Sequence, residues 1–116
     1  MRLTYAKPLA SVSPRRFSER IRSMRNVSGV YVIRRVYDRR VEYVGESHTG
    51  RLYDTLTRHF RSWSGPTAGY TASPEGVEVA VLQVPSNRAV AAQNALIRRL
   101  RPRWNTQGRF EDESPF

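Results

Sequence analysis

The sequence contains no cysteine and a single lysine, Lys7, among its 116 residues. The lack of cysteine excludes disulfide bonds, cysteine zinc sites, iron–sulfur clusters and thiol nucleophiles. No apolar run approaches the roughly 18 residues of a membrane-spanning helix, and the N-terminal residues lack the apolar segment of a secretory signal. We therefore expect one cytoplasmic domain over residues 1–116 that has no membrane partner.

Acidic residues are also few. The chain has 10 Asp and Glu against 20 Lys and Arg, which gives a formal net charge of +10, and nineteen of the basic residues are arginine. A charge this large on a small domain attracts polyanions, nucleic acid first. The planar guanidinium fork suits phosphate, although an arginine-rich composition can also reflect codon usage.

Hydrophobic spacing and turn residues predict six elements. We expect a helix over 14–25 after an N-cap at Ser13, strands at 29–35 and 41–45, a helix over 50–63, a strand at 77–82 and a helix over 87–101 capped by Ser86. An irregular arm (1–12), a surface loop (64–76), an extended segment (103–105) and a loose acidic tail (106–116) accompany them. The order α-β-β-α-β-α predicts an α+β fold, in which helices flank a three-stranded, mainly antiparallel sheet.

The first two strands form an expected hairpin, because only residues 36–40 separate them. Side chains alternate between the faces of a strand. Tyr31 and Tyr43 therefore share a face if odd positions pair with odd positions. Pairing of Ile33 with Val41 would set the two tyrosines directly opposite each other, and a slip by one residue would separate them.

A polar residue interrupts the apolar stripe of the last helix. Gln93 lies four residues after Ala89 and three before Leu96, on the same helix face. A buried amide without hydrogen-bond partners costs about 1–3 kcal/mol. Gln93 therefore requires partners or a function.

Two short strings share a pattern, Gly29-Val30-Tyr31 and Tyr43-Val44-Gly45, and their tyrosines lie twelve residues apart. Arg51 opens the next predicted helix, and Pro102 and Asn105 follow the last one. The two strings and these three residues, taken in this order along the chain, resemble the GIY-YIG nuclease family, with Val in place of Ile in both strings. The resemblance covers about residues 28–105.

The resemblance implies a DNA endonuclease that hydrolyses phosphodiester bonds with one divalent ion, Mg²⁺ or Mn²⁺. It assigns water deprotonation to Tyr31, orientation of the water or phosphate to Tyr43, the scissile phosphate to Arg51 and support of the site to Asn105. His59 would be either a proton carrier behind the groups that touch the substrate or a hydrogen-bond donor to the phosphate. Metal and arginine stabilise the charge that develops on the phosphate, whereas a tyrosine with its ordinary pKa near 10 is a poor base.

The resemblance places the family's metal-binding Glu at position 93. This chain has Gln93 there instead. Mg²⁺ favours anionic oxygen ligands, so we expect metal binding by this chain to be weak or lost. Two interpretations remain. In the one we prefer, the natural protein has Glu at this position and this chain carries a deliberate Glu→Gln change. In the other, the chain is a natural relative with weak catalytic activity that binds DNA without cutting it. Glu42 and Glu46 flank the second string. We expect Glu42 to be an exposed strand residue and Glu46 to be a loop residue.

The expected DNA interface consists of Arg51, Arg58, Arg61 and His48, extended by Arg15, Arg16 and Arg20. We expect Trp63 and Trp104 to pack in the core. Specificity would come from the loop 64–76 or from a partner, and the chain would be a monomer or a weak dimer, encoded by a bacterium or a phage. The alternatives are a basic module that binds DNA or RNA without metal, and a membrane-surface protein that uses residues 14–25.

Overall fold

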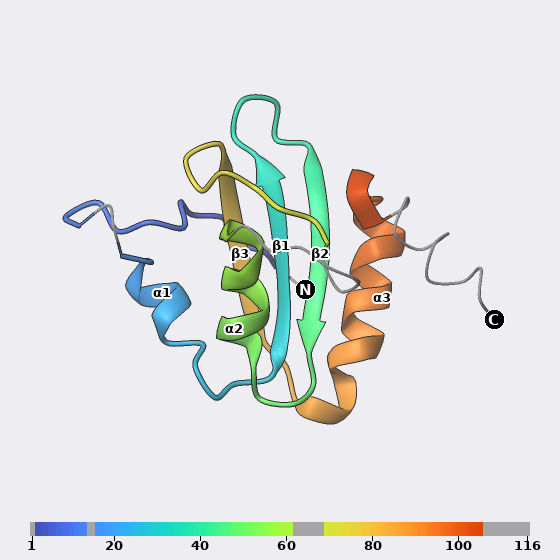
Figure 1. Ribbon diagram of the computed structural model, residues 1–116. Coiled ribbons are helices and arrows are strands. Elements are labelled where there is room, and N and C mark those ends of the chain that lie inside the picture. The colour runs from blue at the N-terminus through green and yellow to red at the C-terminus, as the bar shows by residue number, and fades with distance from the viewer. Residues whose placement is uncertain (1, 14–15, 62–68, 106–116) are drawn as a thin grey trace.

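The computed structural model describes residues 2–13, 16–61 and 69–105. Its centre is a sheet of three strands, β1 (Gly29–Arg35), β2 (Val41–Ser47) and β3 (Val77–Gln83). The strands lie in the order β2-β1-β3 and both pairings are antiparallel (Figure 1). The predicted α+β class with an antiparallel sheet is confirmed, and so is the order of the elements.

The helices are shorter than the hydrophobic spacing predicts. They are α1 (Glu19–Arg22), α2 (Leu52–Thr57), which continues as the 3₁₀ turn η1 (Arg58–Phe60), and α3 (Ala89–Leu100), which follows the 3₁₀ turn η2 (Ser86–Arg88). Ser18, not Ser13, caps α1, and its side chain accepts a hydrogen bond from the Ile21 N–H. Arg88, not Ser86, occupies the N-cap of α3. That helix ends where Arg101 takes a left-handed conformation, φ 50°, directly before Pro102.

The sheet separates two apolar cores, because β1 is buried on both faces. Its odd residues, such as Ile33, pack with α1 and α2 in the first core. Its even residues, Val30 and Val32, pack with Leu96 of α3 in the second core. Figure 1 shows α2 in front of the sheet and α3 along its β2 side. Within the described residues, no helix has the length and apolar character to cross a membrane.

The register of the hairpin places the two tyrosines on one face. Tyr31 pairs with Gly45, and Ile33 pairs with Tyr43. The tyrosines are therefore diagonal neighbours rather than directly opposite. The pairing shifts after Ile33, because Arg34 pairs with Val41, which leaves Glu42 as the extra residue of a bulge.

Two segments outside the regular elements pack differently from expectation. The N-terminal arm is not wholly irregular, because Ala6 exchanges two backbone hydrogen bonds with Val79 of β3, at 3.0 and 2.8 Å. Residues 103–105 form a helical turn rather than an extended segment. The expectations for Arg15, Trp63, the start of the loop and the acidic tail fall outside the described residues.

Candidate functional site

A hydrogen-bonded chain of three groups lies on the α2 side of the sheet. The Tyr31 hydroxyl is 2.6 Å from Nε2 of His59, and Nδ1 of His59 is 2.6 Å from the Tyr70 carbonyl oxygen. A carbonyl oxygen only accepts, so Nδ1 carries the imidazole proton. Nε2 of the neutral ring therefore accepts the Tyr31 proton. The ring has one fixed tautomer, and the phenol donates to it.

Burial keeps both members of this pair neutral. Tyr31 is 1% exposed and His59 is 5% exposed. Burial raises the pKa of Tyr31 well above its ordinary value, and the nearby Tyr43 and Glu46 add to the rise. Burial also lowers the pKa of His59, against a smaller opposite effect of the Tyr70 carbonyl. At neutral pH the phenol therefore holds its proton and the imidazole is uncharged.

Gly45 makes room for the Tyr31 phenol. A β-carbon at position 45 would lie 2.3 Å from both Cζ and the hydroxyl oxygen of Tyr31. Such a contact is impossible without moving the ring. The glycine of the second string is thus needed because the phenol of the first string lies directly against it.

An aromatic cluster surrounds the pair. The Tyr43 ring lies 4.6 Å from the His59 ring between centroids, stacks on Tyr70 at 5.5 Å and meets Trp104 edge-on at 6.0 Å. The prediction that Trp104 packs in the core is confirmed. Sequence reasoning missed Tyr70, since it placed that residue in a surface loop, where no pattern distinguishes a buried tyrosine.

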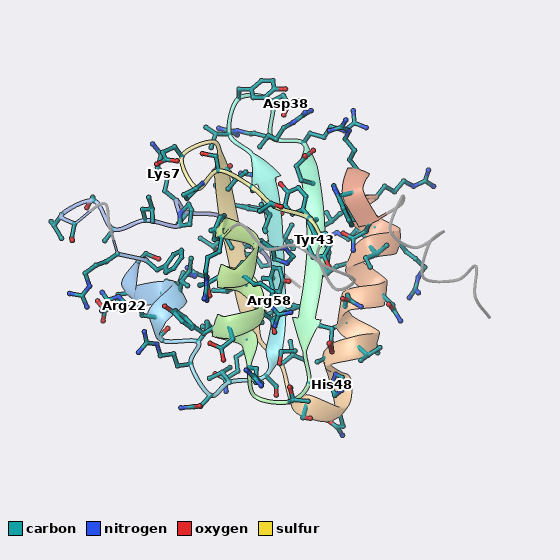
Figure 2. All side chains as sticks on the ribbon, in the orientation of Figure 1. Lys7, Arg22, Asp38, Tyr43, His48 and Arg58 are labelled. Atoms are coloured by element: carbon teal, nitrogen blue, oxygen red, sulfur yellow. The ribbon has the colours of Figure 1, made fainter. Side chains whose placement is uncertain are left out.

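Arg58, rather than Arg51, is the arginine whose charge acts on the phenol and the imidazole. The positive charge of Arg58 lowers the pKa of both Tyr31 and His59. Figure 2 shows Arg58 on the α2 side of the sheet, where Tyr43 also lies. Arg51 instead precedes α2, pairs with Asp54 at 3.5 Å and lines a cleft of about 610 Å³ together with Arg25.

The other expected DNA contacts lie at different places. Arg61 donates from Nη2 to the Thr57 hydroxyl at 3.1 Å. His48 is exposed after the end of the hairpin and pairs through Nδ1 with Glu46 at 2.7 Å (Figure 2). Glu46 itself belongs to β2, so the expectation that it is a loop residue is wrong.

Asn105 binds the outer edge of β2. Its side-chain oxygen accepts from the Val44 N–H at 2.6 Å, and its side-chain nitrogen donates to the Val44 carbonyl at 2.9 Å. β2 is an outer strand, so these backbone groups have no strand partner on that side. The amide replaces a missing neighbour strand at this one residue, and brings the adjacent Trp104 against Tyr43.

Gln93 lies on the helix that covers the other face of the sheet. It is half-buried, and its amide donates to Oδ1 of Asn94 at 3.5 Å. The described residues contain no group of three or more His, Cys, Asp or Glu that could hold a metal ion. A neutral amide in such surroundings does not fit a resident divalent cation.

Glu42 is buried, so the expectation of an exposed strand residue is wrong. It is the extra residue of the bulge, and it is 7% exposed. Its carboxylate is 3.7 Å from the guanidinium groups of Arg35 and Arg103, and Oε2 accepts no hydrogen bond within the described residues. Its charge contributes to the rise of the Tyr70 pKa to about 12, which is caused first by burial.

No protein-family model matches the chain, and no curated protein matches it at a significant level. These comparisons therefore assign no family to the chain.

Proposed function

We propose that the chain is a phosphodiesterase of the GIY-YIG type that acts on DNA. The observation that carries the proposal is the hydrogen bond between Tyr31 and the neutral His59. A phenol alone is a poor base, whereas a phenol that hands its proton to an imidazole can accept one from water. The resemblance of the two tyrosine strings and the net charge of +10 support DNA as the substrate.

The proton moves along one line. Water gives a proton to the Tyr31 oxygen while the phenol proton passes to Nε2 of His59. The resulting hydroxide forms a bond to phosphorus, the bond from phosphorus to the leaving oxygen breaks, and that oxygen takes a proton from solvent. The imidazolium keeps its Nδ1 hydrogen bond to the Tyr70 carbonyl. Arg58 and Tyr43 orient the phosphate, and the guanidinium stabilises its developing charge.

A divalent metal takes no part in this scheme, because the described residues do not fit one. The resemblance places a carboxylate at position 93, so the Gln93→Glu variant is the form that we expect to bind Mg²⁺ or Mn²⁺.

A second function has its own support. Tyr31 is 1% exposed, so water reaches its hydroxyl only after a local opening. Together with the amide at position 93, this covering favours a protein that binds DNA and cuts it slowly or not at all. The two functions differ in one measurable respect, which is cleavage by the Gln93→Glu variant.

The test is nicking of supercoiled plasmid with Mg²⁺ or Mn²⁺. We expect Gln93→Glu to nick faster than the chain with Gln93, and Tyr31→Phe or His59→Gln in that background to lose at least about 100-fold in rate, the range of general acid–base catalysis. Tyr37→Phe is the control, because Tyr37 is 79% exposed on the hairpin turn.

DNA binding is measured in parallel on every variant. Lost cleavage with unchanged binding supports the proposal. If Tyr31→Phe cuts as fast as Tyr37→Phe, or if neither the chain with Gln93 nor its Gln93→Glu variant nicks the plasmid, the nuclease function is wrong, and the binding function takes its place.

A further inference from the structure

A second basic site lies on the opposite face of the sheet from Tyr31. It is a cleft of about 620 Å³ between the N-terminal arm and the C-terminal end of α3. Four arginines line it, Arg2, Arg34, Arg39 and Arg99, together with Tyr5 and Leu100. The apolar lining residues pack on the second core, under α3. We call this the arginine cleft.

Arg34 is held in place by two neighbours. Its Nε donates to Oε1 of Glu78 at 2.6 Å, and the two residues are direct partners across β1 and β3. The guanidinium carbon lies 3.6 Å from the centroid of the Tyr5 ring. These contacts use Nε and one face of the group. Within the described residues its two terminal nitrogens donate no hydrogen bond, and these nitrogens form the fork that binds phosphate.

Among the described residues, four arginines and no acidic residue line the arginine cleft. Glu78, beside the cleft, pairs with Arg34. Burial raises the pKa of Tyr5, and the positive charges of Arg34 and Arg99 lower it. Positive charges that lie close together on one surface repel one another, and a bound anion reduces this repulsion. The arrangement is therefore suited to a bound polyanion.

We propose that the arginine cleft binds the phosphodiester backbone of a nucleic acid. The four guanidinium groups come from the arm, from β1, from the hairpin turn and from the end of α3. A nucleic-acid strand presents successive phosphates along its length, which suits guanidinium groups that come from four separate segments. Because the cleft and Tyr31 lie on opposite faces, the strand held here is a different segment from one bound at Tyr31.

This proposal does not depend on the proposed function, because binding here requires no cleavage. Its test uses two matched double variants. Arg39→Gln with Arg99→Gln removes two charges from the arginine cleft. Arg40→Gln with Arg98→Gln removes two charges from the neighbouring positions, which do not line it. All four side chains are exposed, so both variants are expected to fold.

Binding of a fluorescein-labelled 25-base-pair duplex, and of its single strand, is measured by anisotropy over a series of KCl concentrations with EDTA present. We expect the cleft variant to bind about tenfold more weakly than the control variant at 0.1 M KCl. Its slope of log affinity against log salt is expected to fall by about 1.8 for the duplex, since each phosphate contact contributes about 0.9. Tyr31→Phe in either background is expected to leave the difference between the two variants unchanged.

Equal losses in the two double variants would overturn the proposal, because they would show a response to total charge alone. It would also be overturned if the cleft variant lost binding to vesicles of anionic phospholipid and kept its affinity for both oligonucleotides. That result would identify the arginine cleft as a membrane contact.

Discussion

Replacing Asn105 with alanine tests how the segment after α3 is attached to the sheet. The side chain makes two hydrogen bonds to Val44, at 2.6 and 2.9 Å, and is 9% exposed. The alanine variant leaves the N–H and the carbonyl of Val44 without these partners. An unpaired buried group costs about 1–3 kcal/mol. We expect a loss of about 2–4 kcal/mol, because water entering the vacated space recovers part of the cost.

This loss is a large share of the total, since domains have about 5–15 kcal/mol of unfolding free energy. Urea denaturation followed by tryptophan fluorescence measures it. Asn87→Ala is the control, because Asn87 is exposed in η2 and surface substitutions change stability by about 0.5 kcal/mol or less. A loss below about 0.5 kcal/mol for Asn105→Ala would refute the reasoning.

Asn105→Asp separates the two hydrogen bonds. The carboxylate still accepts from the Val44 N–H, but it faces the Val44 carbonyl oxygen without a proton to donate. We expect this variant to be no more stable than Asn105→Ala at pH 7. At acid pH the protonated carboxyl donates again, so its stability relative to Asn105→Ala should rise. Comparing the two variants at each pH cancels the titration of all other groups.

Three further predictions follow. Gly45→Ala should lose about 1–3 kcal/mol of unfolding free energy, because the new β-carbon would lie 2.3 Å from the Tyr31 phenol. The displaced phenol should also break its hydrogen bond to His59, which a changed His59 signal in NMR spectra would show. The folded chain lowers the pKa of His59 below the ordinary 6.5, so the unfolded chain binds the proton more readily. The unfolding free energy should therefore fall as pH drops below about 6.5, and His59→Gln should flatten that profile. Glu42→Gln should lower the pKa of Tyr70 from about 12, as read by absorbance at 295 nm against Tyr70→Phe; an unchanged value would contradict the contribution of that carboxylate.

The strands could be predicted from the sequence because their signals are local. β1 is apolar on both faces and takes the central place, and residue alternation brings Tyr31 and Tyr43 to one face. The exact register could not be predicted, since the bulge at Glu42 depends on how the hairpin turn closes. That bulge is also why a charged residue of an outer strand is buried.

The candidate site was predictable only in part. The resemblance names Tyr31 and His59 as site residues but does not predict their hydrogen bond, and the arginine whose charge acts on both is Arg58 rather than Arg51. α2 begins after Arg51, and periodicity alone does not fix where a helix starts. The Tyr70 carbonyl comes from a loop, and backbone groups carry no sequence signal. Neither the tautomer of His59 nor the role of Asn105 could therefore be derived from residue types.

A three-stranded sheet has two outer borders on which another copy of the chain could add a strand. The side-chain amide of Asn105 occupies backbone groups on the border of β2, and the backbone of Ala6 does the same on the border of β3. This matters for a protein of net charge +10, because long polyanions concentrate such proteins along their length. Crowded copies can then lie next to one another while their sheets stay separate.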